Sequence, residues 1–344
     1  MALPKFFGLD IGNSSIKIAQ IKDPTSKTPK LVKIGSIETP PSTYGNSDEA
    51  SKKKLAEAIK ELVDQLGLDT KNAVTAVSER DVFSTRIKIS YTDEKDLEES
   101  AYWEISRVMP VPIDTVNYGY LPISLTEEGG KKEMEALVIS IEKTISDQYA
   151  EIVELAGLNP IALETEGVAI VRASSRALPA ENMQGSLIID MGSNSTSVCV
   201  VKGQSIVYST SIQSGSEVIT RSISQAFSLD VVQSEEYKKT YGVDEKYFEG
   251  KIANVIKPVL DTIILDINRA IQFFRQENPD SNITSIKLLG ESSAMPGLVA
   301  YMTKSLGIAV EIIDPTMGLV TGSLNIENKQ TFAVAIGLAL KTDF

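Results

Sequence analysis

The chain has 344 residues, of which 42% are hydrophobic and 23% are charged, and its mean hydropathy is close to zero. This length and composition predict a soluble globular protein with two or more domains. The formal net charge of −12 and the pI near 4.8 argue against a nucleic-acid or anionic-membrane partner, because both need clustered lysine and arginine. Any phosphate that the chain binds is therefore expected to be small and held locally.

Histidine is absent, which excludes serine–histidine–aspartate and cysteine–histidine nucleophilic sites, histidine general bases and histidine-containing zinc sites. The single cysteine, Cys199, lies in an apolar strand pattern, so no intramolecular disulfide can form and the side chain is expected to be buried. No apolar run reaches the length of a membrane span, and the N-terminus lacks a signal-peptide pattern. We expect a protein of the reducing cytoplasm.

The N-terminal region predicts an α/β sheet. Residues 5–39 read as three successive strands, the first of which ends in the turn DIGNSS at 10–15. A helix is predicted over 48–68, where leucine, isoleucine and valine recur at helical spacing and Gly67 marks the end. A fourth strand follows at 73–78. Three strands, a helix and a strand indicate a mixed sheet covered by helices.

The pattern changes near residue 83, and we interpret 83–157 as a small α+β insertion. A helix over 92–109, with Thr92 as its candidate N-cap, precedes a hairpin whose turn is EEGGKK and a helix from 144 to 156. The aromatic residues of the insertion could form its core or an exposed surface for a partner, and we favour the core. These residues are Tyr102, Trp103 and Tyr120.

A second copy of the first turn lies in the stretch SLIIDMGSNSTSVCVV at 186–201. Shifting it back by 180 positions places Asp190 on Asp10 and Gly192 on Gly12. Each copy predicts a strand that ends in an acid, a turn of small residues and a second strand. One copy alone is typical of an ordinary hairpin, but two copies half a chain apart predict a duplicated domain with two facing turns.

Two facing turns of this kind can hold a polyphosphate between them, because backbone N–H groups in glycine- and serine-rich turns bind anions. Asp10 and Asp190 would repel each other there unless a cation lay between them. Mg²⁺ fits, since it prefers oxygen ligands and bridges carboxylates to phosphate oxygens. Lys17 either reaches the phosphates as a point charge or is an exposed lysine of the strand.

The remaining elements follow in order. A strand running into a helix is predicted over 161–178, before the second turn, and shorter helices precede a long helix at 251–277. Pro258 is expected to kink or interrupt that long helix. Residues 283–307 read as strand, turn and helix, and the apolar stretch at 332–341 suits a buried closing helix.

This order of parts resembles the actin-like ATPase superfamily, and within it the PilM family of type IV pilus assembly proteins, relatives of the division protein FtsA. GLDIGNSSIK and DMGSNST look like the two phosphate motifs, LLGESSAMPGL looks like the adenosine motif, and AYWEISRVMPVP with VNYGYLPI is similar to the PilM insertion. The resemblance covers essentially the whole chain. It implies a duplicated actin-like (ribonuclease H-like) α/β fold, with two domains flanking a nucleotide cleft. The implied parts are a first domain at 1–82 and 158–185, an SHS2-type inserted subdomain at 83–157, a second domain at 186–212 and 286–344, and a lid subdomain at 213–285.

The resemblance also implies roles for single residues. Asp10 and Asp190 would organise hydrated Mg²⁺, and both halves would bind ATP. Glu166 would lie near the attacking water, although a glutamate at a helix N-terminus is also favoured by the helix dipole alone. Glu291 stands where the family usually has a second glycine in the adenosine motif. The residues expected to bind the nucleotide are Gly12, Asn13, Ser14, Ser15, Lys17, Gly192, Ser193, Asn194, Ser195, Gly215, Glu217, Glu235, Lys238, Gly290, Ser292 and Ala294.

The function implied by the resemblance is that of a cytoplasmic ATP-binding component of a type IV pilus, or related secretion, assembly platform at the inner membrane. We expect at most slow ATPase activity. The chain would recruit the cytoplasmic N-terminal peptide of the inner-membrane protein PilN into a groove between the first domain and the insertion, in a nucleotide-sensitive way.

Three alternatives stay open. An FtsA-like division ATPase would need a C-terminal membrane tether, which we do not expect because the chain ends at KTDF directly after the closing helix. A sugar kinase would need a sugar pocket with an aspartate base, and none is identifiable. A filament-forming cytoskeletal protein is compatible with the sequence. Self-association is possible, whereas nucleic-acid binding and direct membrane insertion are not expected.

Overall fold

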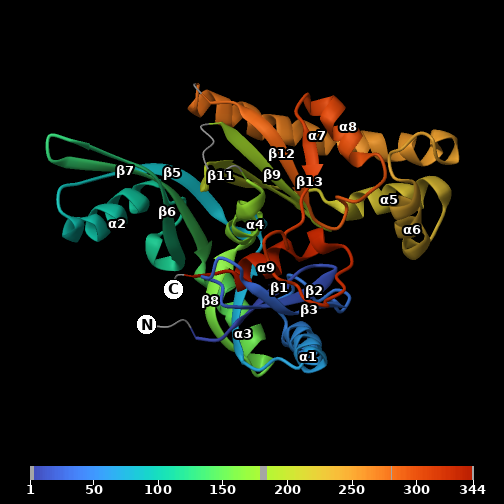
Figure 1. The fold of residues 1–344 in the computed structure, drawn as a ribbon, viewed down its shortest axis with the longest axis horizontal. Coiled ribbons are helices and arrows are strands. Elements are labelled where there is room, and N and C mark those ends of the chain that lie inside the picture. The colour runs from blue at the N-terminus through green and yellow to red at the C-terminus, as the bar shows by residue number, and fades with distance from the viewer. Residues whose placement is uncertain (1–3, 179–183, 280, 343–344) are drawn as a thin grey trace.

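The computed structural model describes residues 4–178, 184–279 and 281–342. Its lower half in Figure 1 is built on a five-stranded sheet with the strand order β3-β2-β1-β4-β8. Strand β1 pairs with β2 in antiparallel and with β4 in parallel orientation, and β4 pairs in parallel with β8. The strands are β1 (Phe7–Ile11), β2 (Ser15–Lys22), β3 (Lys30–Glu38), β4 (Asn72–Val77) and β8 (Asn159–Thr165).

The upper half repeats this arrangement with the strand order β11-β10-β9-β12-β13. Here β9 pairs with β10 in antiparallel and with β12 in parallel orientation, so β9 corresponds to β1. The duplicated domain predicted from the two turns is confirmed, and the two equal sheets agree with the actin-like α/β fold that the resemblance implied. The strands of this half are β9 (Gly185–Met191), β10 (Thr196–Lys202), β11 (Ser205–Ile212), β12 (Ile283–Leu289) and β13 (Val310–Ile312).

Helix α1 (Glu49–Leu66) covers the first sheet and has the expected start and stop signals. The Asp48 carboxylate accepts a hydrogen bond from the Ser51 N–H group at 2.9 Å. Gly67 ends the helix in the left-handed region at φ 58°, which a residue with a Cβ adopts only at a cost. The predicted helix is therefore confirmed within two residues at either end.

Two buried helices, α4 (Glu166–Ser174) and α9 (Ala333–Ala339), form the layer between the two sheets (Figure 1). All residues of α9 are buried, as the apolar closing stretch predicted. Helix α9 passes so close to its neighbours that a Cβ at Gly337 would overlap the carbonyl oxygen of Ala169 in α4. A Cβ at Gly8 in β1 would likewise overlap the Ala335 carbonyl oxygen. The two halves are thus joined through backbone contacts that only glycine permits.

Replacing Gly337 by alanine should destabilise the protein. The added methyl group has no space against the α4 backbone, so α9 must move, and overpacking of this kind costs about 1–3 kcal/mol. The urea midpoint of unfolding measures the loss. Gly119→Ala is the matched control, because a Cβ there meets no atom within 4 Å. Equal midpoints for the two variants would contradict the close approach of α9 to α4.

The insertion is a three-stranded sheet, β5-β7-β6, with helix α2 (Leu97–Val108) packed against it at the left of Figure 1. Thr92 does not cap this helix. The Asp93 carboxylate instead accepts a hydrogen bond from the Lys95 N–H group and starts a short 3₁₀ turn ahead of α2. The strands are β5 (Phe83–Tyr91), β6 (Val116–Glu128) and β7 (Lys131–Glu142).

Two of the three aromatic residues predicted for the core of the insertion are exposed. Trp103 is 60% and Tyr102 is 40% exposed, and their rings contact each other edge to face. Tyr120 does pack against the core, which is made of aliphatic side chains such as Ile89 and Ile105. The expectation was wrong because the helical period places Ala101 and Ile105, rather than the two aromatic rings, on the inner face.

Helix α3 (Lys143–Leu155), which the sequence grouped with the insertion, packs on the first half. Its residues Ile152 and Val153 share a core cluster with Leu55 and Ile59 of α1. The insertion therefore leaves the first half at the end of β4 and returns to it through α3, so both of its connections are anchored in the same core.

The second half carries helices α5 (Ser216–Phe227), α6 (Val231–Tyr241), α7 (Lys251–Glu277) and α8 (Leu298–Leu306). Helix α7 runs without interruption through Pro258, contrary to one of the two outcomes expected at that residue. Its buried face, which includes Ile256, Ile263 and Phe274, packs on the second sheet. Within the described residues, no helix is both long enough and apolar enough to cross a membrane.

Candidate nucleotide site

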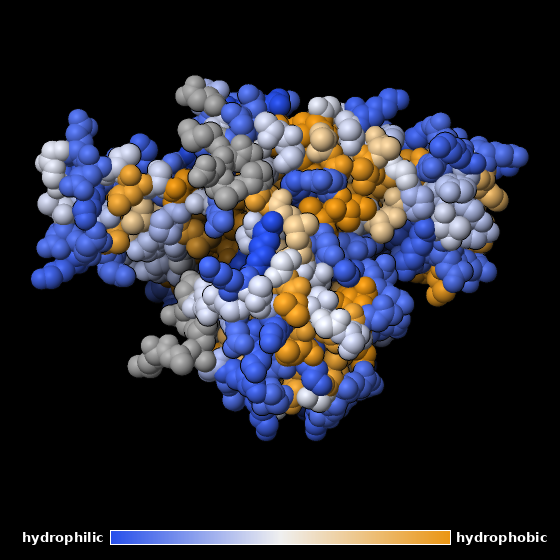
Figure 2. Space-filling model, in the orientation of Figure 1, coloured by the Kyte–Doolittle hydropathy of each residue, from blue (hydrophilic) through white to orange (hydrophobic). Residues whose placement is uncertain are grey.

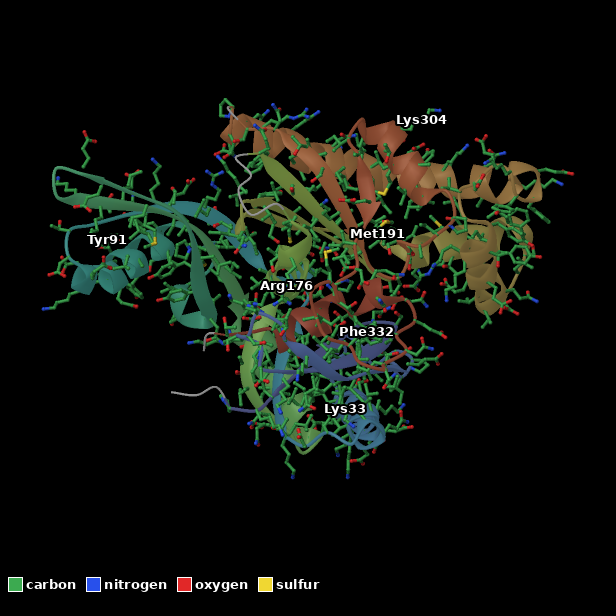
Figure 3. The ribbon with its side chains drawn as sticks, viewed as in Figure 1. Lys33, Tyr91, Arg176, Met191, Lys304 and Phe332 are labelled. Atoms are coloured by element: carbon green, nitrogen blue, oxygen red, sulfur yellow. The ribbon has the colours of Figure 1, made fainter. Side chains whose placement is uncertain are left out.

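The two turns of the repeat lie in contact between the halves of the molecule. In each, a glycine folds the chain tightly against a serine carbonyl oxygen: a Cβ would stand 2.8 Å from the Ser15 oxygen at Gly12 and 3.0 Å from the Ser195 oxygen at Gly192. Across the gap, the Asn13 side-chain amide donates a hydrogen bond to Ser193 Oγ at 3.2 Å. Figure 3 marks the region with Met191, at the end of β9 above it, and Phe332, just before α9 below it.

A cavity of about 80 Å³ lies between these turns. Asp10 of β1 and Asp190 of β9 both line it, as the repeat predicted. Glu166 lines it as well, because it is the first residue of α4, whose N-cap Thr165 accepts a hydrogen bond from the Val168 N–H group at 3.2 Å. The predicted site residues that line this cavity are Asp10, Gly12, Asn13, Ser14, Lys17, Glu166, Asp190, Gly192, Ser193, Asn194, Ser195 and Gly290.

Burial and mutual repulsion weaken the acidity of the three carboxyl groups. Desolvation raises the pKa of Asp190 to about 7, and the charge of Asp10 adds to the effect. Desolvation also raises the pKa of Asp10, although Lys17 opposes it, and holds the pKa of Glu166 well above its usual value with help from both aspartates. A cation placed among these groups would restore their negative charges.

Lys17 is buried, so the interpretation as an exposed strand lysine is wrong. It pairs with Asp10 in the register of β1 and β2, which places both side chains on the same face of the sheet. Its Nζ atom lies 4.0 Å from Asp10 Oδ2 and 3.5 Å from Glu291 Oε1. The position 180 residues later holds Ser197, which pairs with Asp190, so the repeat supplies this lysine on one side only.

Gly290 connects β12 to the predicted adenosine turn and requires the absence of a side chain. Its φ is 92°, and a Cβ would overlap Asp190 Oδ1 and the Met191 carbonyl oxygen. The next residue, Glu291, points across the gap: its Oε1 atom accepts hydrogen bonds from Ser14 Oγ at 2.6 Å and Ser15 Oγ at 3.2 Å. Glu291 therefore links the predicted adenosine turn to the first phosphate turn.

Four of the predicted nucleotide-binding residues belong to the lid subdomain of the second half and do not line the cavity: Gly215, Glu217, Glu235 and Lys238. The Ser216 and Glu217 N–H groups each donate a 2.9 Å hydrogen bond to the second turn, to the carbonyl oxygens of Gly192 and Ser193, and so fix the start of α5 at Gly215. Further along the lid, Lys238 is buried and forms an ion pair of 2.6 Å with Glu235.

Ser292 and Ala294, which were also predicted to bind the nucleotide, lie on the turn after Gly290 and do not line the cavity. Ser292 is buried, and its Oγ atom has no hydrogen-bond partner in the part of the chain that the structure describes. Ala294 is exposed. A buried hydroxyl without a partner is unusual, and it fits a surface that a polar ligand completes. Ser15, the remaining predicted residue, contacts the site through Glu291 without lining the cavity itself.

A family model described as type IV pilus assembly protein PilM matches residues 8–343. The chain belongs to this family. A solved structure described as the PilM-PilN type IV pilus biogenesis complex is 27% identical, with a TM-score of 0.85 and coverage of 98% of both chains. The structure of MreB 5 of Spiroplasma citri bound to AMPPNP, at 13% identity, a TM-score of 0.55 and coverage of 98% and 95%, shows the shared fold alone.

Two curated relatives are cell division proteins FtsA. The alignment with the protein from Enterococcus hirae is 21% identical and spans 91% of this chain and 79% of FtsA. The alignment with the protein from Streptococcus pneumoniae is 22% identical and spans 54% of this chain and 44% of that FtsA, less than half its length. Both agree with the relation to actin-like proteins that the motifs indicated.

Several residues that line the cavity were not predicted from the sequence. Ser78 and Arg80 line the cavity because they follow β4, whose end lies beside that of β1. Polar residues at the carboxyl end of a strand parallel to the one carrying Asp10 were a usable signal. Tyr44 comes from a loop and gave no signal. The other cavity residues outside the prediction are Ser197, Glu291, Thr331 and Val334.

The donor set suits a hydrated cation better than a metal held only by protein ligands. No group of three or more His, Cys, Asp or Glu side chains within the described residues is arranged to hold a metal ion. Asp10 and Asp190 nonetheless converge on one cavity from opposite halves. Mg²⁺ usually keeps several waters and takes one or two carboxylates together with phosphate oxygens, so these residues fit it.

The raised pKa values make the stability of the protein without ligands depend on pH. Asp190 binds its proton in the folded protein up to about pH 7 but releases it near pH 4 when unfolded, so stability falls as pH rises from 5.5 to 7.5. The chain has no histidine that would titrate in this window. Asp190→Asn should make the free energy of unfolding fall less steeply with pH, by up to about 1.4 kcal/mol per pH unit. Urea unfolding at several pH values measures this slope.

Asp69→Asn serves as the control for this experiment. Lys5 and Gln20 lower the pKa of Asp69, so it stays ionised throughout the window and its removal should leave the slope unchanged. An Asp190→Asn slope equal to that of the unmodified protein would show that Asp190 is already ionised in the empty cavity.

Proposed function

We propose that the protein binds ATP with Mg²⁺ between its two halves. The observation that carries the proposal is the pair of glycine–serine turns facing each other, each preceded by an aspartate that lines the cavity, with Lys17 beside them. The turns 12–15 and 192–195 would bind phosphate oxygens, and Asp10 and Asp190 would hold the hydrated Mg²⁺, which neutralises phosphate charge when bound.

The cavity sets a condition on this binding. At about 80 Å³ it holds a few waters, far less than a nucleoside triphosphate needs. The halves must therefore separate at the Asn13–Ser193 contact before a nucleotide can enter. We propose that residues 213–285 act as the lid in this movement, with Gly215, Glu217, Glu235 and Lys238 meeting the ribose and base, and with Gly290, Ser292 and Ala294 next to the adenine.

We propose that ATP turnover is slow at best. Glu166 is the candidate group for orienting the attacking water, because it faces the same cavity as both aspartates. Burial and the neighbouring charges hold its pKa well above the usual range. A carboxyl group that keeps its proton is a poor acceptor for the proton of water, so Glu166 would need a nearby positive charge to lower its pKa before it could accept one.

Thermal unfolding with MgATP tests the nucleotide site. A ligand present at about 100 times its Kd stabilises the folded protein by about 2.7 kcal/mol, so the Tm should rise by several degrees. Asp10→Ala should abolish this rise, and Asp69→Ala, a substitution of an exposed aspartate, should preserve it. If the Tm of the unmodified protein is the same with and without MgATP, the site assignment is wrong.

A second, larger hollow lies where the insertion joins the first half. This groove has a volume of about 620 Å³ and is bounded by β6 on one side and by β8 and α4 on the other. Apolar surface at this junction is visible in Figure 2. An ionic cluster lines it, in which Glu164 accepts hydrogen bonds from Arg172 at 2.7 and 2.8 Å and from Lys341 at 2.7 Å.

We propose that this groove takes the cytoplasmic N-terminal peptide of a PilN-like inner-membrane protein. The similar solved structure with the TM-score of 0.85 is described as a PilM-PilN complex. Strand β6 is an edge of the inserted sheet and β8 is an edge of the first sheet, so within the described residues each has one side without a partner strand in its sheet. An extended peptide can pair with such an edge while its side chains enter the apolar groove. The protein would thereby be held at the cytoplasmic face of the inner membrane and act in pilus or secretion assembly.

The groove and the nucleotide cavity share two segments of chain, which supports a nucleotide-sensitive role. At the end of β4, Val77 lines the groove and Ser78 lines the cavity. At the start of α4, Thr165 lines the groove and Glu166 lines the cavity. A movement of either segment on nucleotide binding changes both sites, which is the physical requirement for coupling between them.

Peptide binding tests the groove with a matched pair of variants. Tyr118 and Tyr102 belong to the insertion and are 41% and 40% exposed, but only Tyr118 lines the groove. Tyr118→Asp should weaken binding of a fluorescent PilN N-terminal peptide at least tenfold, because it places a charge in an apolar groove. Tyr102→Asp should leave the affinity unchanged. Equal effects of the two substitutions would place the peptide elsewhere, and equal affinities with MgATP, MgADP and no nucleotide would refute the coupling alone.

An FtsA-like division ATPase, a sugar kinase and a filament protein are the other functions that a fold of this kind could serve. The family match over residues 8–343 favours pilus assembly over all three.

A further inference from the structure

The carboxylate of Glu291 contacts the first turn from the other half of the molecule. Glu291 belongs to the second half, directly after Gly290 at the end of β12. It accepts hydrogen bonds from Ser14 Oγ and Ser15 Oγ, and Lys17 Nζ lies 3.5 Å away. All three donors belong to the first half. One carboxylate thus joins the two halves across the site.

We propose that Glu291 is a built-in competitor of the nucleotide phosphates, which occupies the first turn of the empty protein and has to leave before a phosphate group can bind there. The inference rests on the nucleotide-binding function proposed above and adds the residue that sets the affinity of that site. It assigns a role to the glutamate that departs from the expected glycine in LLGESSAMPGL.

The competition follows from the small number of donors at the first turn. A hydroxyl group donates one hydrogen bond, so Ser14 and Ser15 each serve either the carboxylate or a phosphate oxygen. The carboxylate is also charged. Burial works against its ionisation, but Lys17 and the two hydroxyl groups outweigh burial and lower the pKa of Glu291. An anion in this position repels an incoming phosphate as well as blocking it.

The contact between Glu291 and the first turn can oppose nucleotide binding and can also be broken by it. The side chain of Glu291 is 32% exposed, so the carboxylate can rotate into water, whereas Lys17 is only 9% exposed and stays in the site. Breaking hydrogen bonds to a charged group opposes binding of a competing anion, and partial exposure reduces the penalty. Displacement of Glu291 should therefore lower nucleotide affinity by about one order of magnitude.

Titration calorimetry with MgATP on the full chain tests the proposal. Glu291→Ala should bind MgATP about tenfold more tightly than the unmodified protein, because the donors are free and the repelling charge is gone. Glu291→Gln, which keeps the shape and one acceptor but loses the charge, should lie in between. Glu311→Gln is the control, since Glu311 pairs with Lys287 at β13, does not line the cavity, and is also a single loss of negative charge.

A second measurement needs no nucleotide and separates this inference from the proposed function. Without Glu291 the first turn loses the hydrogen bonds from Ser14 and Ser15 to the second half and keeps the one from Asn13 to Ser193, so hydrogen exchange of residues 12–15 should be faster in Glu291→Ala than in Glu311→Gln. If neither the unmodified protein nor Glu291→Ala binds MgATP, the proposed function fails, and so does the competitor role. If MgATP binds with the same or lower affinity after Glu291→Ala, or exchange at the turn does not change, the competitor role fails alone.

Discussion

The burial of carboxylates from both halves in one cavity is the constraint on which the rest of the structure depends. Among the described residues, four acidic and two basic side chains line this cavity, so acidic groups outnumber basic ones there. Burial and mutual repulsion favour the protonated forms of Asp190 and Glu166, which carry no charge, when the cavity is empty. The acidic residues are Asp10, Glu166, Asp190 and Glu291, and the basic ones are Lys17 and Arg80.

The fold and much of the site could be predicted from the sequence, because both depend on a repeat. Once Asp190 is aligned with Asp10, the equal strand orders of the two sheets follow, and so does the meeting of the turns. Contacts that the repeat does not duplicate gave no such signal. The carboxylate of Glu291 reaches residues of the first half more than 270 positions earlier in the chain, and no periodicity in the sequence encodes that pairing.

The errors in the insertion have a different cause. Hydrophobicity alone predicts that Tyr102 and Trp103 are buried, but their positions on α2 turn them outward, while the smaller residues Ala101 and Ile105 face the sheet. Thr92 was a reasonable N-cap residue, but Asp93 starts the turn one position later. Both errors depend on where the helix begins. A shift of one residue in the start changes which side chain caps the helix and which side chains face the sheet.

The exposed Trp103 has a practical consequence for optical studies. It is the single tryptophan of the chain, and it lies on α2, at the outer side of the insertion. Its emission spectrum therefore reports the surroundings of this one helix and does not report rearrangements between the two sheets. A change in emission on mixing with another protein would indicate that something covers α2, while a rearrangement confined to the centre of the molecule needs a label placed there on purpose.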